Sequence, residues 1–204
     1  SYRYTYYDDD TTATYNESLR VNSASVSHLP GFFIQNQTYI NSNNTILVGI
    51  RYDFNSIHGA IFTPRINYKI NNNKNSSILR LSAGTGYRVA QVFTEDHAAL
   101  TGAREVVFLD TLNPEKSWNT NINYTNKIFL KRGAIVGTDF SLFYTSFSNK
   151  IIPNYDIDPN KIIYDNLNGK STISGVSLNI NFLDISGLRI NLGVTFMESF
   201  IHQG

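Results

Sequence analysis

A strict alternation of apolar and polar side chains runs along most of this chain, and it limits the possible folds more than any other feature. Between residues 59 and 70, the apolar residues Phe62 and Ile66 stand at even-numbered positions, whereas the charged residues Arg65 and Lys69 stand at odd-numbered positions. A period of two places successive side chains on opposite faces of a β-strand. The same pattern recurs in residues 45–53, 79–84, 117–130, 134–146, 174–182 and 188–196, and residues 1–7 and 30–40 are also strand-like. The sequence therefore predicts an all-β fold.

The length of the alternating segments narrows the choice among all-β folds. Most of them run for about 9 to 13 residues, whereas strands in soluble domains average about 5 to 6. A strand that crosses a bilayer at a tilt of about 45° needs about 9 to 11 residues. Large aromatic residues lie towards the predicted strand ends, as in the aromatic girdles of membrane barrels: Tyr39, Tyr52, Tyr68, Trp118 and Tyr144.

The predicted connections between strands alternate in kind. Short polar breaks stand at residues 41–44, 71–75, 131–133 and 184–187, and a tight break at 55–59; the longer links are 8–29, 87–116 and 149–170. One end of the sheet is therefore tightly turned and the other carries loops, which is typical of outer-membrane barrels. Pro64 cannot donate a hydrogen bond to a ladder, so we expect it at a bulge or an irregular pairing.

Composition excludes several classes of function. The 204 residues carry a formal net charge of +1, which is too small for an extended nucleic-acid footprint. The chain has no cysteine, so it lacks disulfides, thiol catalysis and cysteine-type zinc sites. The sequence contains no apolar run of about 18 residues, which a transmembrane helix requires.

These patterns predict an antiparallel up-and-down meander that forms part of a transmembrane β-barrel. One face, with Phe62 and Ile66, would meet lipid, and the other, with Arg65 and Lys69, would line a wet lumen. The alternation also fits a soluble β-sandwich, such as a carbohydrate-binding or adhesion module, in which the apolar face turns inward. An outer-membrane protein without an import role is a further alternative.

Four segments in a fixed order resemble the barrel of a TonB-dependent outer-membrane receptor, with the Bacteroidetes type as the nearest variety. They are "FTPRINYKI" (62–70), "LRLSAGTGYRVAQVFTEDHAALTGAREVV" (79–107), "LNPEKSWNTNINYT" (112–125) and "NLNGKSTISGVSLNINF" (166–182). The resemblance implies a bacterial outer-membrane location, a barrel of about 22 strands and a plug domain inside it. It also implies the import of a scarce ligand, such as an iron chelate, cobalamin or a glycan, with energy supplied through TonB.

The chain departs from the full pattern of that family. It has about nine predicted strands, and neither a plug domain nor a TonB box is recognisable. We therefore expect residues 1–204 to be one partial barrel domain, which does not transport a ligand by itself. Its partners in the full-length protein would be outer-membrane lipid, the plug, TonB and a small ligand.

Two groups of residues are candidates for ligand contact. The first lies at the ends of the 87–116 link or within it and comprises Arg88, Glu95, Asp96, His97, Arg104 and Glu105. Binding residues concentrate on loops that a rigid scaffold holds. The second group consists of the predicted lumen-facing residues Arg51, Arg65, Arg80 and Arg189. These arginines would attract an anionic ligand, contact the plug, or pair with neighbours such as Asp53 and Asp139 across the wall.

Neither a metal site nor catalysis is expected. Glu95, Asp96 and His97 are adjacent, and adjacent residues rarely converge on one ion; the spacings of known zinc motifs are absent. The segment "GTGYRV" (84–89) lacks the third glycine of a dinucleotide loop. There is no G-x-S-x-G motif or other sign of a nucleophile beside a base. We therefore predict a binding and transport role without a cofactor or an enzymatic reaction.

Overall fold

The computed structural model describes residues 1–7, 15–16, 21–22, 25–56, 58–72, 76–89, 104–108 and 112–203. Nearly all of the described residues lie in β-strands, apart from turns and a short 3₁₀ helix, η1 (Lys131–Gly133). No helix within these ranges has the length and apolar character that crossing a membrane requires.

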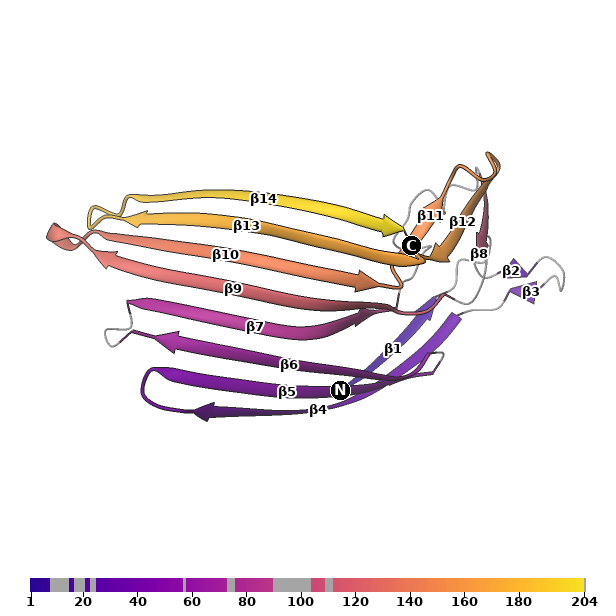
Figure 1. The fold of residues 1–204 in the computed structure, drawn as a ribbon, viewed down its shortest axis with the longest axis horizontal. Helices are drawn as coiled ribbons and strands as arrows, with labels where there is room; N and C mark the ends of the chain where they lie inside the picture. Colours follow the sequence, from indigo (N-terminus) through magenta and orange to yellow (C-terminus); the bar gives the residue numbers. More distant parts are fainter. Residues whose placement is uncertain are drawn as a thin grey trace.

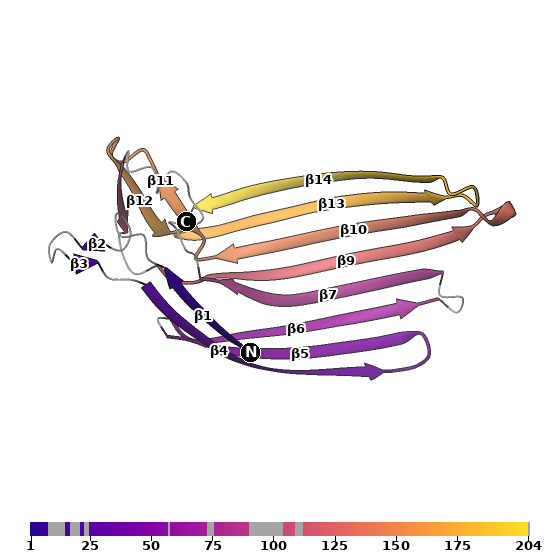
Figure 2. The same cartoon turned by 180° about the vertical axis from the view of Figure 1, so that it is seen from behind.

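Nine strands, eight of them long, form one antiparallel sheet, called the wall here, in the order β1-β4-β5-β6-β7-β9-β10-β13-β14. The strands are β1 (Tyr2–Tyr7), β4 (Ser25–Tyr39), β5 (Asn44–Asn55), β6 (Gly59–Asn71), β7 (Ser77–Arg88), β9 (Glu115–Phe129), β10 (Ile135–Ser148), β13 (Gly169–Leu183) and β14 (Arg189–Gln203). Figures 1 and 2 show them side by side in a single layer. The predicted antiparallel meander of about nine strands is confirmed.

The wall strands are longer than the sequence pattern suggested. Four of them, β4, β9, β13 and β14, have 15 residues each. Alternation of apolar side chains marks only the middle of each strand, because the backbone ladder continues through polar residues at the ends. Strands of this length exceed what a bilayer core requires.

The two ends of the wall differ as predicted. The turns β4–β5, β6–β7, β9–β10 and β13–β14 lie at one end, which we call the turn end (Figure 1). The connections β1–β4, β5–β6, β7–β9 and β10–β13 lie at the other, the loop end, and of these β5–β6 is short. Gly187 in the β13–β14 turn has a φ of 90°, a left-handed conformation that favours glycine.

Three of the predicted links contain strands that the sequence pattern missed. The 87–116 and 149–170 links hold β8 (Glu105–Phe108), β11 (Ile151–Asn154) and β12 (Lys161–Asn166), which form a small sheet at the loop end, called the platform here. These strands are short and carry no alternation. The 8–29 link holds β2 (Tyr15–Asn16) and β3 (Val21–Asn22), and β4 begins within it, because its first residues pair with β1.

Strand register divides the wall into an apolar face and a polar face. Across the middle of the wall, one row of paired residues is apolar: Tyr68, Leu81, Ile122, Leu142, Val176 and Phe196. The adjacent row, on the opposite face, is mostly polar or small: Asn67, Ser82, Asn121, Phe143, Gly175 and Met197. The predicted parity of the alternating segments agrees with this register.

The apolar face is open rather than packed. Phe62 is 58% exposed, Phe196 68% and Leu192 65%. Within the described ranges, no second layer covers this face (Figure 1). A soluble monomer rarely exposes so large a contiguous apolar surface. A β-sandwich is therefore not favoured, since its apolar face would be buried against a second sheet.

Pro64 lies at an irregular pairing, as predicted. Strand β6 pairs with β5 from Gly59 to Ile70, but its ladder with β7 has only seven residue pairs and ends at Arg65, next to Pro64. From this point to the loop end, β6 and β7 are no longer paired with each other. The proline thus marks where the seam between these two strands opens.

Candidate functional site

The residues predicted to contact ligand fall into two regions of the structure. The polar face of the wall carries Arg51, Arg65, Arg80 and Arg189, all with the same facing. The loop end carries Arg88 at the end of β7, Arg104 directly before the platform strand β8, and Glu105 as the first residue of β8. Glu95, Asp96 and His97 lie outside the described residues.

Arg51 and Asp53 form a two-pronged ion pair on β5. Arg51 donates from Nε to Asp53 Oδ2 at 2.6 Å and from Nη2 to Oδ1 at 2.8 Å. Asp53 is fully buried. Gly31 of the neighbouring β4 leaves room for this pair, because a Cβ atom there would collide with Asp53 Oδ1. The pairing of Arg51 with Asp53 was expected from the sequence.

Arg65 crosses the polar face to reach β4. Its Nη2 donates to Gln35 Oε1 at 2.6 Å, over the intervening strand β5. Gly49 of β5 allows this, since a Cβ atom there would lie 2.9 Å from Arg65 Nε. A cavity of about 240 Å³ adjoins the arginine and is lined by Phe33, Ile50, Arg51, Thr63, Arg65 and Thr85.

A larger cavity of about 520 Å³ opens on the polar face towards the turn end. Lys69 of β6 and Arg80 of β7 line it, and the two cations are directly paired across the strands. Like charges directly opposite each other destabilise a sheet. The other lining residues are all uncharged: Gln37, Tyr39, Thr45, Leu47, Asn67, Tyr68, Ser82, Asn121 and Asn123.

An asparagine connects Arg80 with an acidic residue. Arg80 Nη1 donates to Asn123 Oδ1 at 3.1 Å, and Asn123 Nδ2 donates to Asp139 Oδ1 at 3.1 Å. The expected pairing of a lumen arginine with Asp139 is thus indirect. Arg189, the fourth arginine, forms no ion pair with any residue in the described part of the chain.

The loop-end rim is organised around Glu115, a residue that sequence reasoning missed. Glu115 is 4% exposed and its Oε2 accepts a hydrogen bond from Arg88 Nε at 2.7 Å. Its Oε1 accepts from the backbone N–H of Ile151, the first residue of β11, at 2.9 Å. One carboxylate therefore ties β7 and β9 to the platform. The sequence marked this position only by the Pro114-Glu115 pair directly before an alternating segment. That pattern indicates the start of a strand, and it does not indicate that Glu115 bonds to a distant segment.

Asn166 holds the platform from its other side. Its Oδ1 accepts from the backbone N–H of Asn113 at 2.7 Å, and its Nδ2 donates to the carbonyls of Asn113 at 3.0 Å and Asn149 at 2.8 Å. The apolar residues Ile162 and Tyr164 of β12 are buried in the platform. Arg104 lies over the ring of Tyr155, with Cζ 5.8 Å from the ring centroid. The platform is therefore a small packed sheet at the loop end of the wall.

The chemistry of both regions is that of binding. The polar face presents guanidinium, ammonium and carboxamide groups, which donate hydrogen bonds to anions and polar ligands. Among the described residues, no three His, Asp or Glu side chains gather as metal ligands.

Comparison with known proteins identifies what this wall is similar to. A family model described as TonB dependent receptor-like, beta-barrel matches residues 1–202. A variant of the ferric enterobactin receptor PfeA from Pseudomonas aeruginosa matches with a TM-score of 0.73 and 16% identity, over 96% of this chain and 31% of that chain. The siderophore receptor PirA from Acinetobacter baumannii gives 0.70 and 16%, over 96% and 32%.

The hemophore receptor HasR from Serratia marcescens, solved with its hemophore HasA and heme, matches with a TM-score of 0.69 and 14% identity, over 86% of this chain and 34% of that chain. At these identities the likeness shows the fold. The chain spans about a third of the length of these solved receptors. No curated protein matches the chain.

Proposed function

The chain belongs to the TonB-dependent receptor-like β-barrel family of the outer membrane, and on that basis we propose that it forms part of a receptor that binds and imports a scarce ligand. The family match over residues 1–202 carries this proposal. In it, residues 1–204 supply nine strands of the barrel wall. The other strands, the plug domain and the contact with TonB belong to the rest of the protein. The role is binding followed by gated passage, without covalent chemistry.

The ligand class that we propose is an iron chelate. Solved structures with the same fold are named as receptors for ferric enterobactin, for siderophores and for a hemophore, the last in complex with its hemophore and heme. Ferric chelates are often anionic, and the loop end carries the guanidinium groups of Arg88 and Arg104. Cobalamin and glycans are the other ligand classes for which such receptors are built.

The Lys69–Arg80 pair suits an anionic partner within the lumen. Two cations held opposite each other repel, and an anionic group between them would remove that penalty. The pair lies near the turn end, away from the platform. We therefore assign it to contact with an acidic surface of the plug, and we assign ligand capture to the loop end.

The platform is the proposed ligand-contact region. Arg104 and Glu105 lie on it or beside it, and Arg88 joins it to the wall through Glu115. Replacing His97, Arg104 and Glu105 with alanine in the full-length receptor should weaken ligand binding without unfolding the barrel. A binding titration with unchanged affinity would remove this region from the ligand site.

An uptake assay tests the function as a whole. Cells that carry the full-length receptor should take up a ferric siderophore from a panel that covers catecholate, hydroxamate and heme ligands. Uptake should stop when either the receptor or TonB is deleted, and should return with the receptor gene. Import of cobalamin or a glycan, with no import of any iron chelate, would overturn the proposed ligand class but not the proposed role as part of a receptor barrel. Uptake that continues without TonB would overturn the import mechanism.

A further inference from the structure

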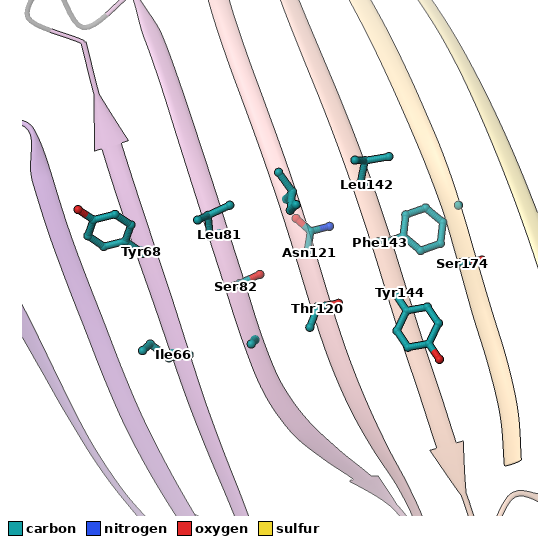
Figure 3. Close-up of a pocket in the computed structure, with 13 residues that line it drawn as sticks. Ile66, Tyr68, Leu81, Ser82, Thr120, Asn121, Leu142, Phe143, Tyr144 and Ser174 are labelled. Atoms are coloured by element: carbon teal, nitrogen blue, oxygen red, sulfur yellow. The ribbon is translucent and has the colours of Figure 1, made fainter.

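The apolar face contains a groove that crosses five strands of the wall. The groove has a volume of about 640 Å³ and lies among residues of β6, β7, β9, β10 and β13 (Figure 3). One side is the apolar row with Tyr68, Leu81, Ile122 and Leu142. The other side is the next row on the same face, which contains the small residues Ala83, Thr120 and Ser174. Small side chains beside large ones make the depression.

A row of basic residues, two lysines and a histidine, lies on the same face at the loop end and is called the cation row here. The register pairs Lys116 with Ser148, Ser148 with Lys170, and Lys170 with His202. All three basic side chains are exposed, and neither lysine forms an ion pair with a described residue. The lysines are two strand spacings apart, about 9 to 10 Å between backbones, so their long side chains can converge on one phosphate.

The cation row and the groove are aligned along the same strands. Along β9, Lys116, Trp118 and Thr120 follow one another on the apolar face. The distance from Lys116 to Thr120 is about 13 Å, at about 3.3 Å per residue. Trp118 and, on β14, Phe200 lie between the cations and the groove, where interfacial aromatic residues mark the headgroup boundary.

Among the described residues, Glu198 is the acidic residue on this part of the face. It ends the row of Thr120, Tyr144 and Ser174, and it accepts a hydrogen bond from Ser174 Oγ at 3.2 Å. It lies four residues below His202 on β14. A carboxylate at that depth repels phosphate, and so favours a headgroup at the cation row with only acyl carbon in the groove.

We propose that this face binds one phosphate-bearing lipid of the outer leaflet, with its phosphate at Lys116, Lys170 and His202 and an acyl chain in the groove. This inference rests on the proposed role of the chain as a lipid-embedded wall. Lipid is the occupant because the groove is continuous with the exposed apolar face, and because the cation row lies on its loop-end side, about 13 Å away along the strands. A neutral lipid leaves the cations without a partner, and a soluble anion leaves the groove empty.

The test is native mass spectrometry of the full-length receptor in detergent, titrated with diphosphoryl lipid A. The unaltered receptor should bind this lipid at least tenfold more tightly than the dephosphorylated form. Equal binding of the two forms would overturn the proposal whether or not any variant folds. Displacement of the lipid by millimolar inorganic phosphate would also overturn it, because the site would then hold an anion alone.

Variants separate the two halves of the site. The double variant Lys116→Gln/Lys170→Gln should lose about thirtyfold in affinity, as expected for two lysines at a membrane surface. Lys127→Gln on the polar face of the same strand is the matched control and should change nothing. Thr120→Leu fills the groove and should weaken binding about tenfold, whereas Thr138→Leu, nearer the turn end of the same face, should not.

Two further outcomes would contradict the proposal. Unchanged binding by both the double lysine variant and Thr120→Leu would show that the lipid binds elsewhere. If the unaltered receptor forms a dimer and Thr120→Leu dissociates it, the groove binds a second copy of the chain and not a lipid. Both readouts use the receptor without siderophore or TonB, so their failure leaves the uptake experiment unaffected.

Discussion

Glu115 is predicted to be the residue that holds the platform on the wall. Its carboxylate accepts from the Arg88 side chain and from the Ile151 backbone, and it is almost fully buried. Glu115→Ala removes both acceptors and leaves the N–H of Ile151 without a partner. We expect the platform to open locally while the wall stays folded, because the wall ladders do not depend on this side chain.

The magnitude follows from the two interactions. A hydrogen bond from a backbone N–H to a charged acceptor contributes about 1.5 to 3 kcal/mol. The Arg88 side chain is 55% exposed, so its ion pair adds only about 0 to 1 kcal/mol. The two ranges together span about 1.5 to 4 kcal/mol, and from the middle of that span we expect Glu115→Ala to lower the free energy of platform opening by about 2 to 3 kcal/mol, which is about 30- to 160-fold in the opening equilibrium. Glu115→Gln keeps a neutral acceptor and should lose about 1 kcal/mol.

Hydrogen exchange of the full-length receptor in micelles measures this effect directly. Amides of β11 and β12 should exchange about 30- to 160-fold faster in Glu115→Ala, whereas those around Ile122 in the wall should not change. Glu198→Gln, which alters a carboxylate on the apolar face, is the control and should leave the platform unaffected. Unchanged exchange in β11 and β12 would refute the role of Glu115.

Two further predictions concern the wall and one of its turns. Gly31→Ala should destabilise the receptor by about 3 kcal/mol, because the new Cβ displaces the buried carboxylate of Asp53. Gly137→Ala is the control and should be tolerated, because the nearest atom to its new Cβ would be 3.8 Å away. Equal melting temperatures of the Gly31→Ala and Gly137→Ala receptors would refute this prediction. Burial lowers the pKa of His58 below its ordinary value of 6.5. The β5–β6 turn should therefore be fully stable above about pH 6.5 and lose stability as the pH falls through the lowered pKa, which hydrogen exchange can follow. His58→Gln should abolish this dependence, and its persistence would contradict the assignment.

Much of the wall was predictable, because the face to which each side chain belongs depends only on its position within its own strand. In a strand with one apolar and one polar face, each residue's facing follows from its parity, so Phe62 and Arg65 could be assigned from the sequence. Turn positions followed from polar and glycine-rich breaks. The ends of the strands were not predictable, because backbone pairing continues past the last alternating residue.

The platform was not predictable, because it is made by contacts between distant parts of the sequence. Strand β8 pairs in parallel with β12, more than 50 residues later in the chain, and neither strand alternates. Glu115 and Asn166 act through backbone groups of other segments, and no local pattern marks such partners. The assignment of His97, Arg104 and Glu105 to the ligand site stays a prediction.

The central claim is that the apolar face of the wall meets lipid and the polar face meets water. The chain contains no cysteine, so single cysteines can be placed at successive positions from 118 to 128 of β9 and spin-labelled. In membranes, even-numbered positions should be accessible to oxygen dissolved in lipid, and odd-numbered positions to an aqueous nickel chelate. Access of the nickel chelate to labels at both even- and odd-numbered positions would contradict the claim and favour a soluble β-fold.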